Sequence, residues 1–197
     1  MSLCIIPARG GSTRVPFKNG RRFLGKPMLS YAIRAAKESD CFDRIIVSTD
    51  DERIAAIAKH YGAIVHNRAP KLCDNEVGTQ EVMAHVLREI KVPDNELVCC
   101  LYPCVPLLEP NWFHVAIGMY QLRPCSYVVA VADNPLRDIG NFYVGGAGAF
   151  IREQPLYNTH TGLFVVPPER AIDINTEDDW QLAEKMFLAL AMPLGVA

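Results

Sequence analysis

Short apolar runs alternate with helical patterns along almost the whole sequence. Because the runs are continuously apolar, they predict strands buried on both faces, as in a parallel sheet covered by helices on each side. This order of βα units predicts an α/β three-layer sandwich. The predicted strands are Leu3–Pro7, Arg44–Thr49, Ala63–His66, Leu97–Tyr102, Tyr127–Ala132 and Gly162–Val166. The predicted helices are Met28–Ser39, Asp51–Tyr61, Thr79–Ile90, Asn111–Leu122 and Glu177–Ala191.

Two segments add detail to this pattern. Residues Asn141–Arg152 depart from the βα rhythm, because two apolar runs flank Gly145 and Gly146, and we expect a short antiparallel hairpin there at the sheet edge. Thr176 precedes the last predicted helix, and its hydroxyl is expected to accept a hydrogen bond from the amide of Asp179. No repeat or linker interrupts the chain, so we expect a single domain over residues 1–197.

Charge and composition exclude several classes of protein. Lys and Arg number 20 against 22 Asp and Glu, and the formal net charge of −2 argues against a nucleic-acid partner. No apolar run is long enough to cross a bilayer and the chain leads directly into a predicted strand, which predicts a cytoplasmic protein without a membrane partner. The seven cysteines form no C-x-x-C pair, which favours reduced core residues over a zinc site. The five histidines show no H-x-x-x-H spacing.

The loop after the first predicted strand has the composition of a phosphate-binding site. In an open α/β sheet, ligands bind outside the carboxyl ends of the strands, where this loop begins. Gly10 and Gly11 allow backbone amides to approach an anion closely. Three cations and two neutral hydrogen-bonding side chains accompany them, namely Arg9, Arg14, Lys18, Ser12 and Asn19. The loop therefore predicts a polyphosphate site, and a solvated basic turn is the alternative.

Two familiar phosphate-binding motifs are excluded. The dinucleotide fingerprint G-x-G-x-x-G is absent, because no third glycine follows Gly10 and Gly11 in register, and a nicotinamide cofactor is not expected. Residues 20–26 (GRRFLGK) match the P-loop pattern, but no strand precedes them and Pro27 stands where a hydroxyl should bind magnesium. Residues 25–27 are instead expected to turn the chain into the first helix.

Four segments spread along the chain form a set of motifs. They are Ile5–Asn19, Gly25–Met28, Val47–Asp51 and Asp173–Trp180. This set resembles the acylneuraminate cytidylyltransferases, also called CMP-sialic acid synthetases. Gly78–Thr79 and Asp138–Gly145 make the pseudaminic acid cytidylyltransferases the most similar branch. The resemblance implies a Rossmann-like nucleotidyltransferase fold with a mainly parallel sheet, and magnesium-dependent transfer of CMP from CTP to a nine-carbon keto-acid sugar.

The resemblance also implies a set of nucleotide-binding residues. Those implied to bind the triphosphate are Arg9, Gly10, Gly11, Ser12 and Lys18. Asn19 and Arg68 are implied to lie near the ribose and the cytosine, and a surface position is the alternative for Arg68. Ala8 and Arg14 of the same loop complete the predicted set.

A magnesium site is implied just before the last helix. Asp173 matches the first acid of the family's D-x-D metal pair, whereas Asn175 stands at the second position and offers an uncharged amide oxygen. The predicted metal ligands are thus Asp173 and Asn175, and the predicted catalytic residues are Arg9, Lys18 and Asp173. The alternative is that Asp173 and Asn175 only form a turn before the capped helix.

Other features leave alternatives open. Asp50 and Asp51 are either a helix cap or ligands, and residues 102–106 are expected to line the sugar pocket, with no support for Cys104 as a nucleophile. In members of this branch, a longer arm serves dimerisation and covers the sugar pocket. In this chain only Asp133–Arg137 stands in its place, so the homodimer that the resemblance allows is doubtful. A degenerate nucleotide-binding homologue is therefore the rival interpretation. A third is the same reaction on N-acetylneuraminic, legionaminic or 3-deoxy-manno-octulosonic acid.

Overall fold

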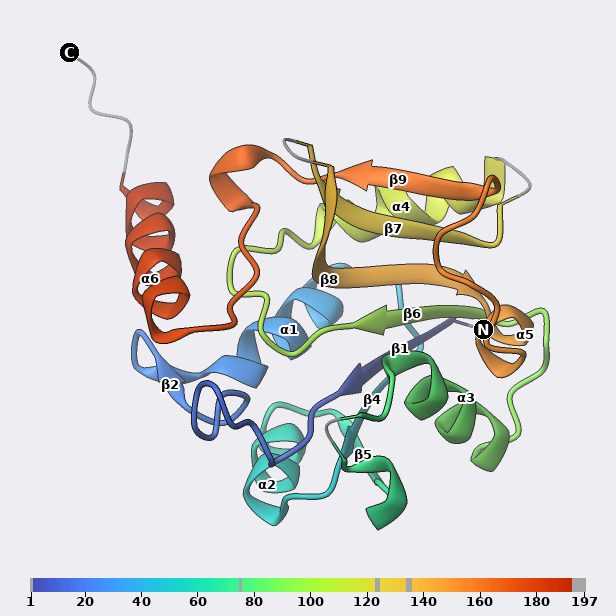
Figure 1. Ribbon diagram of the computed structural model, residues 1–197, viewed down its shortest axis with the longest axis horizontal. Helices are drawn as coiled ribbons and strands as arrows, with labels where there is room; N and C mark the ends of the chain where they lie inside the picture. Colours follow the sequence, from blue (N-terminus) through green and yellow to red (C-terminus); the bar gives the residue numbers. More distant parts are fainter. Residues whose placement is uncertain (1, 75, 123–124, 134–135, 193–197) are drawn as a thin grey trace.

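One long sheet runs through the molecule and carries the other elements (Figure 1). The computed structural model describes residues 2–74, 76–122, 125–133 and 136–192. The order of the seven strands is β5-β4-β1-β6-β8-β7-β9, and only β8 is antiparallel to its neighbours. The strands are β1 Ser2–Pro7, β4 Arg44–Thr49, β5 Ile64–Asn67, β6 Leu97–Leu101, β7 Tyr127–Ala132, β8 Arg137–Gly146 and β9 Thr161–Val165.

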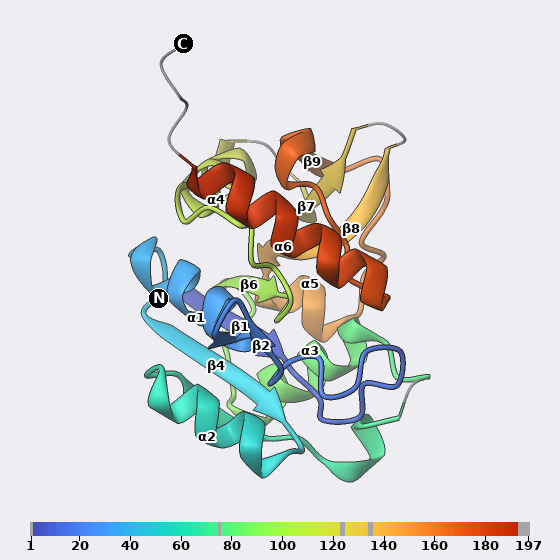
Figure 2. The same ribbon diagram turned by 90° about the vertical axis from the view of Figure 1, so that its left-hand side faces the viewer.

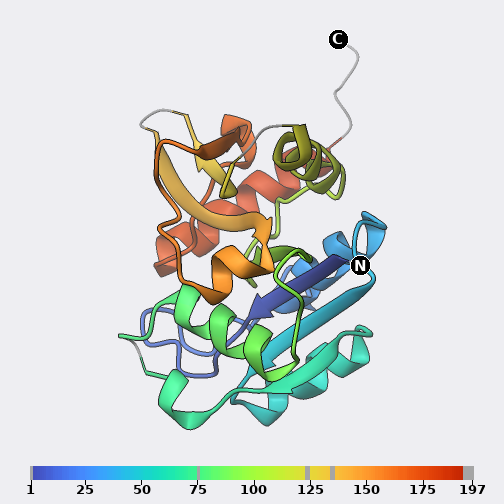
Figure 3. The same ribbon diagram turned by 90° about the vertical axis from the view of Figure 1, so that its right-hand side faces the viewer.

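Helices cover both faces of this sheet. One face carries α1 Met28–Glu38, α2 Glu52–His60 and α4 Asn111–Leu122, and the other carries α3 Thr79–Glu89 and α5 Ala147–Ile151, which lie side by side in Figure 3. Short 3-10 turns, η1 and η2, span Pro70–Leu72 and Pro168–Arg170. No described helix is both long and apolar enough to cross a membrane.

The alternation of β1 shows why three layers form. Cys4 and Ile6 pack in the core under α1, α2 and α4, whereas Leu3 and Ile5 pack in the core under α3 and α5. Successive side chains of a strand point to opposite faces, so a continuously apolar strand fills both cores. The predicted three-layer α/β sandwich is confirmed.

The prediction of burial on both faces is wrong for the two edge strands. Ile64 of β5 is 51% exposed and Val165 of β9 is 48% exposed. Each edge strand has a neighbour on one side only, and the helices cover it incompletely. Apolar sequence alone therefore does not separate an edge strand from a central one.

The predicted hairpin at Asn141–Arg152 is also wrong. These residues form the second half of β8, which lies between β6 and β7 rather than at an edge, and then enter α5. The glycines are present for close packing, since a Cβ on Gly145 would lie 2.7 Å from the ring of Tyr127. The antiparallel pairing of β7 and β8 instead ends at Ala132 and Arg137, and positions 134 and 135 between them lie outside the described residues.

A small hairpin precedes α1. Strands β2 Arg22–Phe23 and β3 Lys26–Pro27 pair antiparallel around Leu24 and Gly25, both of which have positive φ angles. Two-residue hairpin turns need such angles, which glycine adopts without strain. The expectation that residues 25–27 turn the chain into the first helix is confirmed, because α1 begins at Met28.

Helix α6 Glu177–Ala191 begins at the predicted cap. The amide of Asp179 donates to Thr176 Oγ1 at 3.2 Å, and the amide of Thr176 donates back to Asp179 Oδ2 at 2.8 Å. Burial raises the pKa of Asp179, but hydrogen bonds from the backbone of Asn175 and Thr176 and from the Thr176 hydroxyl outweigh it and lower the pKa below 3.8. This capping box therefore stabilises α6 only while Asp179 is ionised.

The capping box leads to a pH-dependent prediction. Asp179→Ala should lower the free energy of unfolding by about 1 kcal/mol at pH 7. Because the pKa of Asp179 is lower in the folded chain, this contribution is complete above the unfolded pKa and disappears as the pH falls through the folded one. The difference in free energy of unfolding between the variant and the natural chain, measured with urea, should therefore be smaller at about pH 3 than at pH 7. Asp178→Ala, at an exposed neighbour, is the control, and an undiminished difference for Asp179→Ala at the low pH would contradict the assignment.

Candidate active site

A cleft of about 240 Å³ opens at the carboxyl ends of β1 and β6. The chain passes from β1 to β4 and β5 on one side and only then to β6 on the other, so the cleft lies where the strand order reverses. Figure 2 views this end of the sheet, with α6 lying across it and the loop after β1 beside the start of α6. Segments far apart in the sequence line the cleft, namely the end of β1 and the loop after it, residues 68–82, residues 102–104, Gly140 and residues 173–175.

Most of the predicted site residues meet in this one cleft. Those that line it are Arg9, Ser12, Arg14, Lys18, Asn19, Arg68, Asp173 and Asn175. Ala8 is fully buried, and its amide donates to the carbonyl of Ser48, so it supports the loop from below. Gly10 and Gly11 are outside the lining, although they belong to the same loop.

The Gly10 amide is held by protein rather than free. It donates to Asp50 Oδ1 at 2.8 Å, and a Cβ on Gly10 would lie 2.7 Å from the Cβ of Asp51. Asp51 accepts hydrogen bonds from the amides of Arg53 and Ile54 and thus caps α2. The hydrogen bond from the Arg53 side chain lowers the pKa of Asp51. The cap interpretation of Asp51 is confirmed, and Asp50 holds the glycine loop in place.

A third apolar cluster joins the loop to α6. Val15 is buried in it together with Ile174 and Trp180. Lys18 Nζ donates to the carbonyl oxygen of Ile174 at 2.6 Å. The loop and the predicted metal ligands therefore form one packed unit, although more than 150 positions separate Lys18 from Ile174.

Asn19 and Cys104 hold the floor of the cleft. Asn19 is 5% exposed, and its Nδ2 donates to the carbonyl of Arg9 at 2.8 Å, while its Oδ1 accepts from the Cys104 thiol at 3.3 Å. Burial raises the pKa of Cys104 to about 12, which keeps this thiol protonated. These contacts hold the Asn19 side chain in place in the lining of the cleft, and a protonated thiol is a poor nucleophile.

Arg68 is a buried cation, so the surface alternative is wrong. The residue is 7% exposed, and its Nη2 donates to the carbonyl of Ser48 at 2.9 Å. Desolvation lowers its pKa, as expected for a guanidinium removed from water. A buried cation that lines a cleft attracts an anionic ligand more strongly than an exposed one, because water screens it less.

Asp173 and Asn175 lie side by side in the cleft. Asn175 Nδ2 donates to Asp173 Oδ2 at 2.5 Å, and the amide of Asn175 donates to Asp179 Oδ2 at 2.9 Å. The pair therefore belongs both to the turn before α6 and to the lining of the cleft. The two interpretations of the pair are compatible, since a turn can present oxygen ligands.

Reasoning from sequence missed a group of hydroxyls beside the cleft. Tyr102 and Thr79 line it, and their hydroxyl oxygens are 2.8 Å apart. The Tyr143 hydroxyl donates to Asp138 Oδ2 at 2.6 Å, and its oxygen lies 3.4 Å from the Tyr102 hydroxyl. Burial raises the pKa of Tyr102 to about 12, so its hydroxyl remains a donor. The predicted lining by residues 102–106 pointed to Tyr102, and Tyr102, Pro103 and Cys104 do line the cleft. Thr79, Asp138 and Tyr143 lie in segments that carry the resemblance, which gave them no role in the site.

Comparisons with known proteins agree with the sequence motifs. The sequence model of the cytidylyltransferase family matches residues 3–136. A pseudaminic acid cytidylyltransferase of Campylobacter jejuni is 30% identical over 222 residues, covering 94% of this chain and 96% of that protein. A CMP-N,N'-diacetyllegionaminic acid synthase of Legionella pneumophila is 28% identical, covering 94% and 95%.

A solved structure supports the fold. A CMP:2-keto-3-deoxy-manno-octonic acid synthetase complexed with CTP superposes with a TM-score of 0.77 at 15% identity, covering 98% of this chain and all of that one. The expected Rossmann-like nucleotidyltransferase fold is thereby confirmed. Since the family model matches most of the sequence and a relative at 30% identity is covered almost end to end, the chain belongs to the cytidylyltransferase family.

Proposed function

We propose that this protein transfers CMP from CTP to a nonulosonic acid, most similar to pseudaminic acid, and releases pyrophosphate. The observation that carries the proposal is the convergence of Arg9, Arg14, Lys18 and Arg68 with Asp173 on a single cleft. Four cationic side chains in one cleft can balance the negative charge of a triphosphate. A carboxylate among them can bind a metal ion that also contacts the phosphates. The names of the relatives point to cytosine as the base of the nucleotide and to a nonulosonic acid as the acceptor.

Catalysis by this cleft is mainly positioning and electrostatics. The anomeric hydroxyl of the sugar attacks the α-phosphorus and gives up its proton to water or to a phosphate oxygen of the substrate. The bond from the α-phosphorus to the bridging oxygen breaks in line with the new P–O bond, and pyrophosphate leaves. Arg9 and Lys18 stabilise the charge that develops on the phosphate oxygens, because they are already held in place before the reaction. Arg68 is the buried cation at the wall of the cleft.

Asp173 and Asn175 fit a magnesium ion. Magnesium is commonly bound by one or two carboxylates together with substrate phosphates, and it prefers oxygen ligands. Asp173 supplies a carboxylate in the cleft, and rotation of the Asn175 amide offers its oxygen at the same place. When bound, magnesium would neutralise charge on the phosphates.

We expect the acceptor sugar to bind on the side of the cleft that Thr79 and Tyr102 line. Thr79 and Tyr102 offer hydroxyls there, and Asp138 and Tyr143 hold Tyr102 in position. A polyhydroxylated keto-acid sugar matches such donors and acceptors. N-acetylneuraminic, legionaminic and 3-deoxy-manno-octulosonic acids remain alternative acceptors with the same chemistry.

Assembly and location belong to the same proposal. The match with the Campylobacter protein extends over 222 residues, more than the 197 of this chain, so that protein has residues that this chain lacks. We propose that the missing residues include the dimerisation arm, so that any homodimer of this chain forms without it, and that neither a nucleic acid nor a membrane is a partner. The cysteines at positions 4, 41, 73, 99, 100 and 104 carry free thiols, which fits the cytoplasm.

Pyrophosphate release tests the proposed reaction. The protein is incubated with CTP, magnesium and each of the candidate sugars, with UTP, ATP and GTP as nucleotide controls. Release with CTP and one sugar is the expected result, and it identifies the acceptor. No release with any pair, from protein shown to be folded by circular dichroism, overturns the proposal and favours a homologue without turnover.

That rival has one observation in its favour, the amide at position 175. Asn175→Asp adds a charged ligand, so the magnesium concentration for half-maximal rate should fall about tenfold, with turnover changed only a few-fold. In the absence of metal, this variant loses the hydrogen bond between Asn175 and Asp173 and places two carboxylates next to each other. Because like charges repel, the variant should unfold at a lower temperature than the natural chain in EDTA. If the substitution instead creates activity that the natural chain lacks, the natural metal site is impaired and the rival is correct.

A further inference from the structure

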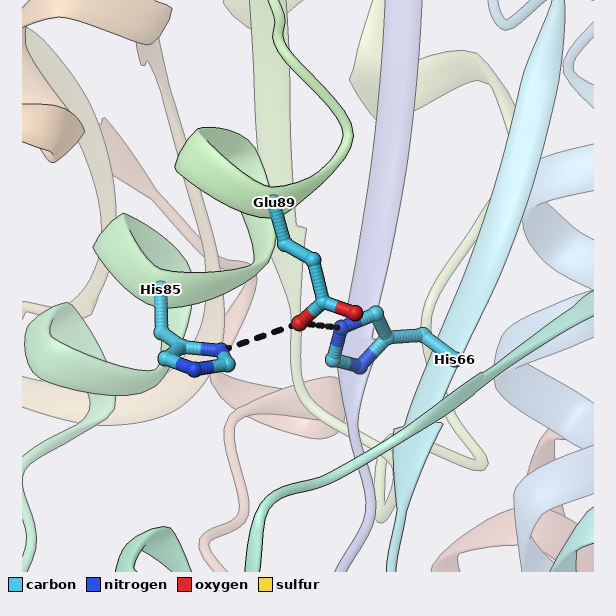
Figure 4. Close-up of side chains that lie close together, drawn as sticks. All are labelled: His66, His85 and Glu89. Carbon is cyan, nitrogen blue, oxygen red and sulfur yellow. Dashed lines mark hydrogen bonds and ion pairs between the residues drawn. The ribbon is translucent and has the colours of Figure 1, made fainter.

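A cluster of two histidines and a glutamate lies between β5 and α3, outside the lining of the cleft. Figure 4 shows the Glu89 carboxylate between the rings of His66 and His85. His66 Nε2 is 3.1 Å and His85 Nδ1 is 3.5 Å from Glu89 Oε2, and one ligand atom from each residue lies within 4.8 Å of the others. His85 and Glu89 are one helical turn apart on α3, and β5 brings His66 to them from the sheet edge.

We infer that His66, His85 and Glu89 bind a divalent transition-metal ion of the zinc type. Zinc bonds of about 2.0 to 2.2 Å at tetrahedral angles place neighbouring ligand atoms about 3.3 Å apart. The two distances to Glu89 Oε2 are already close to that value. Two imidazoles and a carboxylate are a ligand set that suits zinc, and they leave a fourth position for water.

The surroundings of His66 hold its ring in the orientation that a metal needs. The side chain is only 6% exposed, and its Nδ1 lies 3.2 Å from Ser48 Oγ. With the hydrogen on Nδ1, donated to Ser48 Oγ, the lone pair of Nε2 points into the cluster. Metal-binding histidines usually have such a partner on the other ring nitrogen.

His85 contributes a nitrogen that has an ion-pair contact with Glu89 but no hydrogen bond among the described residues. This nitrogen, Nδ1, is a buried atom, and Glu89 Oε2 lies 3.5 Å from it. Buried polar atoms are nearly always satisfied, so an unpaired one next to two other ligands points to a bound group. Glu89 is 56% exposed, which leaves a path for an ion from solvent.

The inferred metal would hold one wall of the cleft. The chain between His66 and His85 contributes Arg68, Leu72, Asp74, Val77, Thr79 and Val82 to the lining. Arg68 Nε also approaches Ser48 Oγ, at 3.4 Å, so His66 and Arg68 share one partner. A metal at the two ends of this segment would restrict its motion, whether or not the proposed reaction is correct.

Metal binding by the intact chain tests the inference. After treatment with a chelator, the protein is titrated with zinc by calorimetry and with cobalt by visible absorption. We expect one ion per chain, cobalt bands without a thiolate charge-transfer band, and slower hydrogen exchange in the segment between His66 and His85 once zinc is added. His85→Ala and Glu89→Gln should each weaken zinc binding by about tenfold to a hundredfold or more.

Matched variants separate this site from other binding. His114 lies 3.4 Å from the thiol of Cys41, a pair that could take up zinc adventitiously, so His114→Ala is the control and should leave the binding unchanged. Glu89→Gln retains an acceptor for His66 and should fold normally. No zinc binding by the natural chain, or equal binding by the natural chain and folded His85→Ala, would overturn the inference and leave only a hydrogen bond between β5 and α3.

Discussion

Lys18→Ala should lower the rate of pyrophosphate release about a hundredfold or more, because removing one preorganised donor from developing charge costs about 3 to 4 kcal/mol in the transition state. The ammonium group is held by the carbonyl oxygen of Ile174 at 2.6 Å, beside Asp173 and Asn175. It therefore lies at the junction of the loop and the metal-binding segment. Steady-state kinetics with CTP in excess measure the effect on turnover.

A matched lysine makes this test specific. Lys26 is exposed on β3 and does not line the cleft, so Lys26→Ala removes the same charge without touching the site. It should leave turnover within about twofold, since exposed charges at a distance are screened by salt. A near-normal rate for Lys18→Ala, or an equal loss for Lys26→Ala, would remove Lys18 from the mechanism.

Asp173→Asn should reduce turnover by at least about a hundredfold, because the charge stabilisation expected from a bound metal is several kcal/mol. After the substitution, both predicted metal ligands are uncharged amides, and neither supplies a carboxylate. The fold should survive, since the new amide oxygen can still accept the hydrogen bond from Asn175. Added magnesium should not restore the rate within its soluble range.

Asp178→Asn is the control for this second variant. Asp178 is exposed on the first turn of α6, so the same change of charge occurs close to the site but outside the cleft. Its turnover and magnesium dependence should match those of the natural chain. Normal magnesium dependence in Asp173→Asn would show that Asp173 does not hold the metal, and the turn-forming interpretation would then suffice.

The loop after β1 could be predicted because its chemistry is local. Arg9, Gly10, Arg14 and Lys18 lie within ten residues, and a parallel strand ends immediately before them. Their place at the carboxyl end of a strand follows from the order of elements alone. The same holds for the cap of α6, where Thr176 and Asp179 are three residues apart.

Contacts between distant segments could not be predicted in this way. Nothing in the sequence indicates that β8 lies between β6 and β7, and this insertion brings Asp138 and Tyr143 to Tyr102. The glycine pair at 145–146 was misleading, since a turn and a close approach to Tyr127 call for the same residue. Burial of Arg68 likewise depends on neighbours from β4.

The sequence by itself determined the three layers of helices and sheet, the basic loop and the resemblance to a family, because periodicity and short motifs are properties of neighbouring residues. Only the tertiary structure decided which residues share the cleft, and that His66 meets His85 and Glu89. The physical reason is that packing of the sheet and helices sets distances between residues far apart in the chain, and that packing is a property of the whole fold.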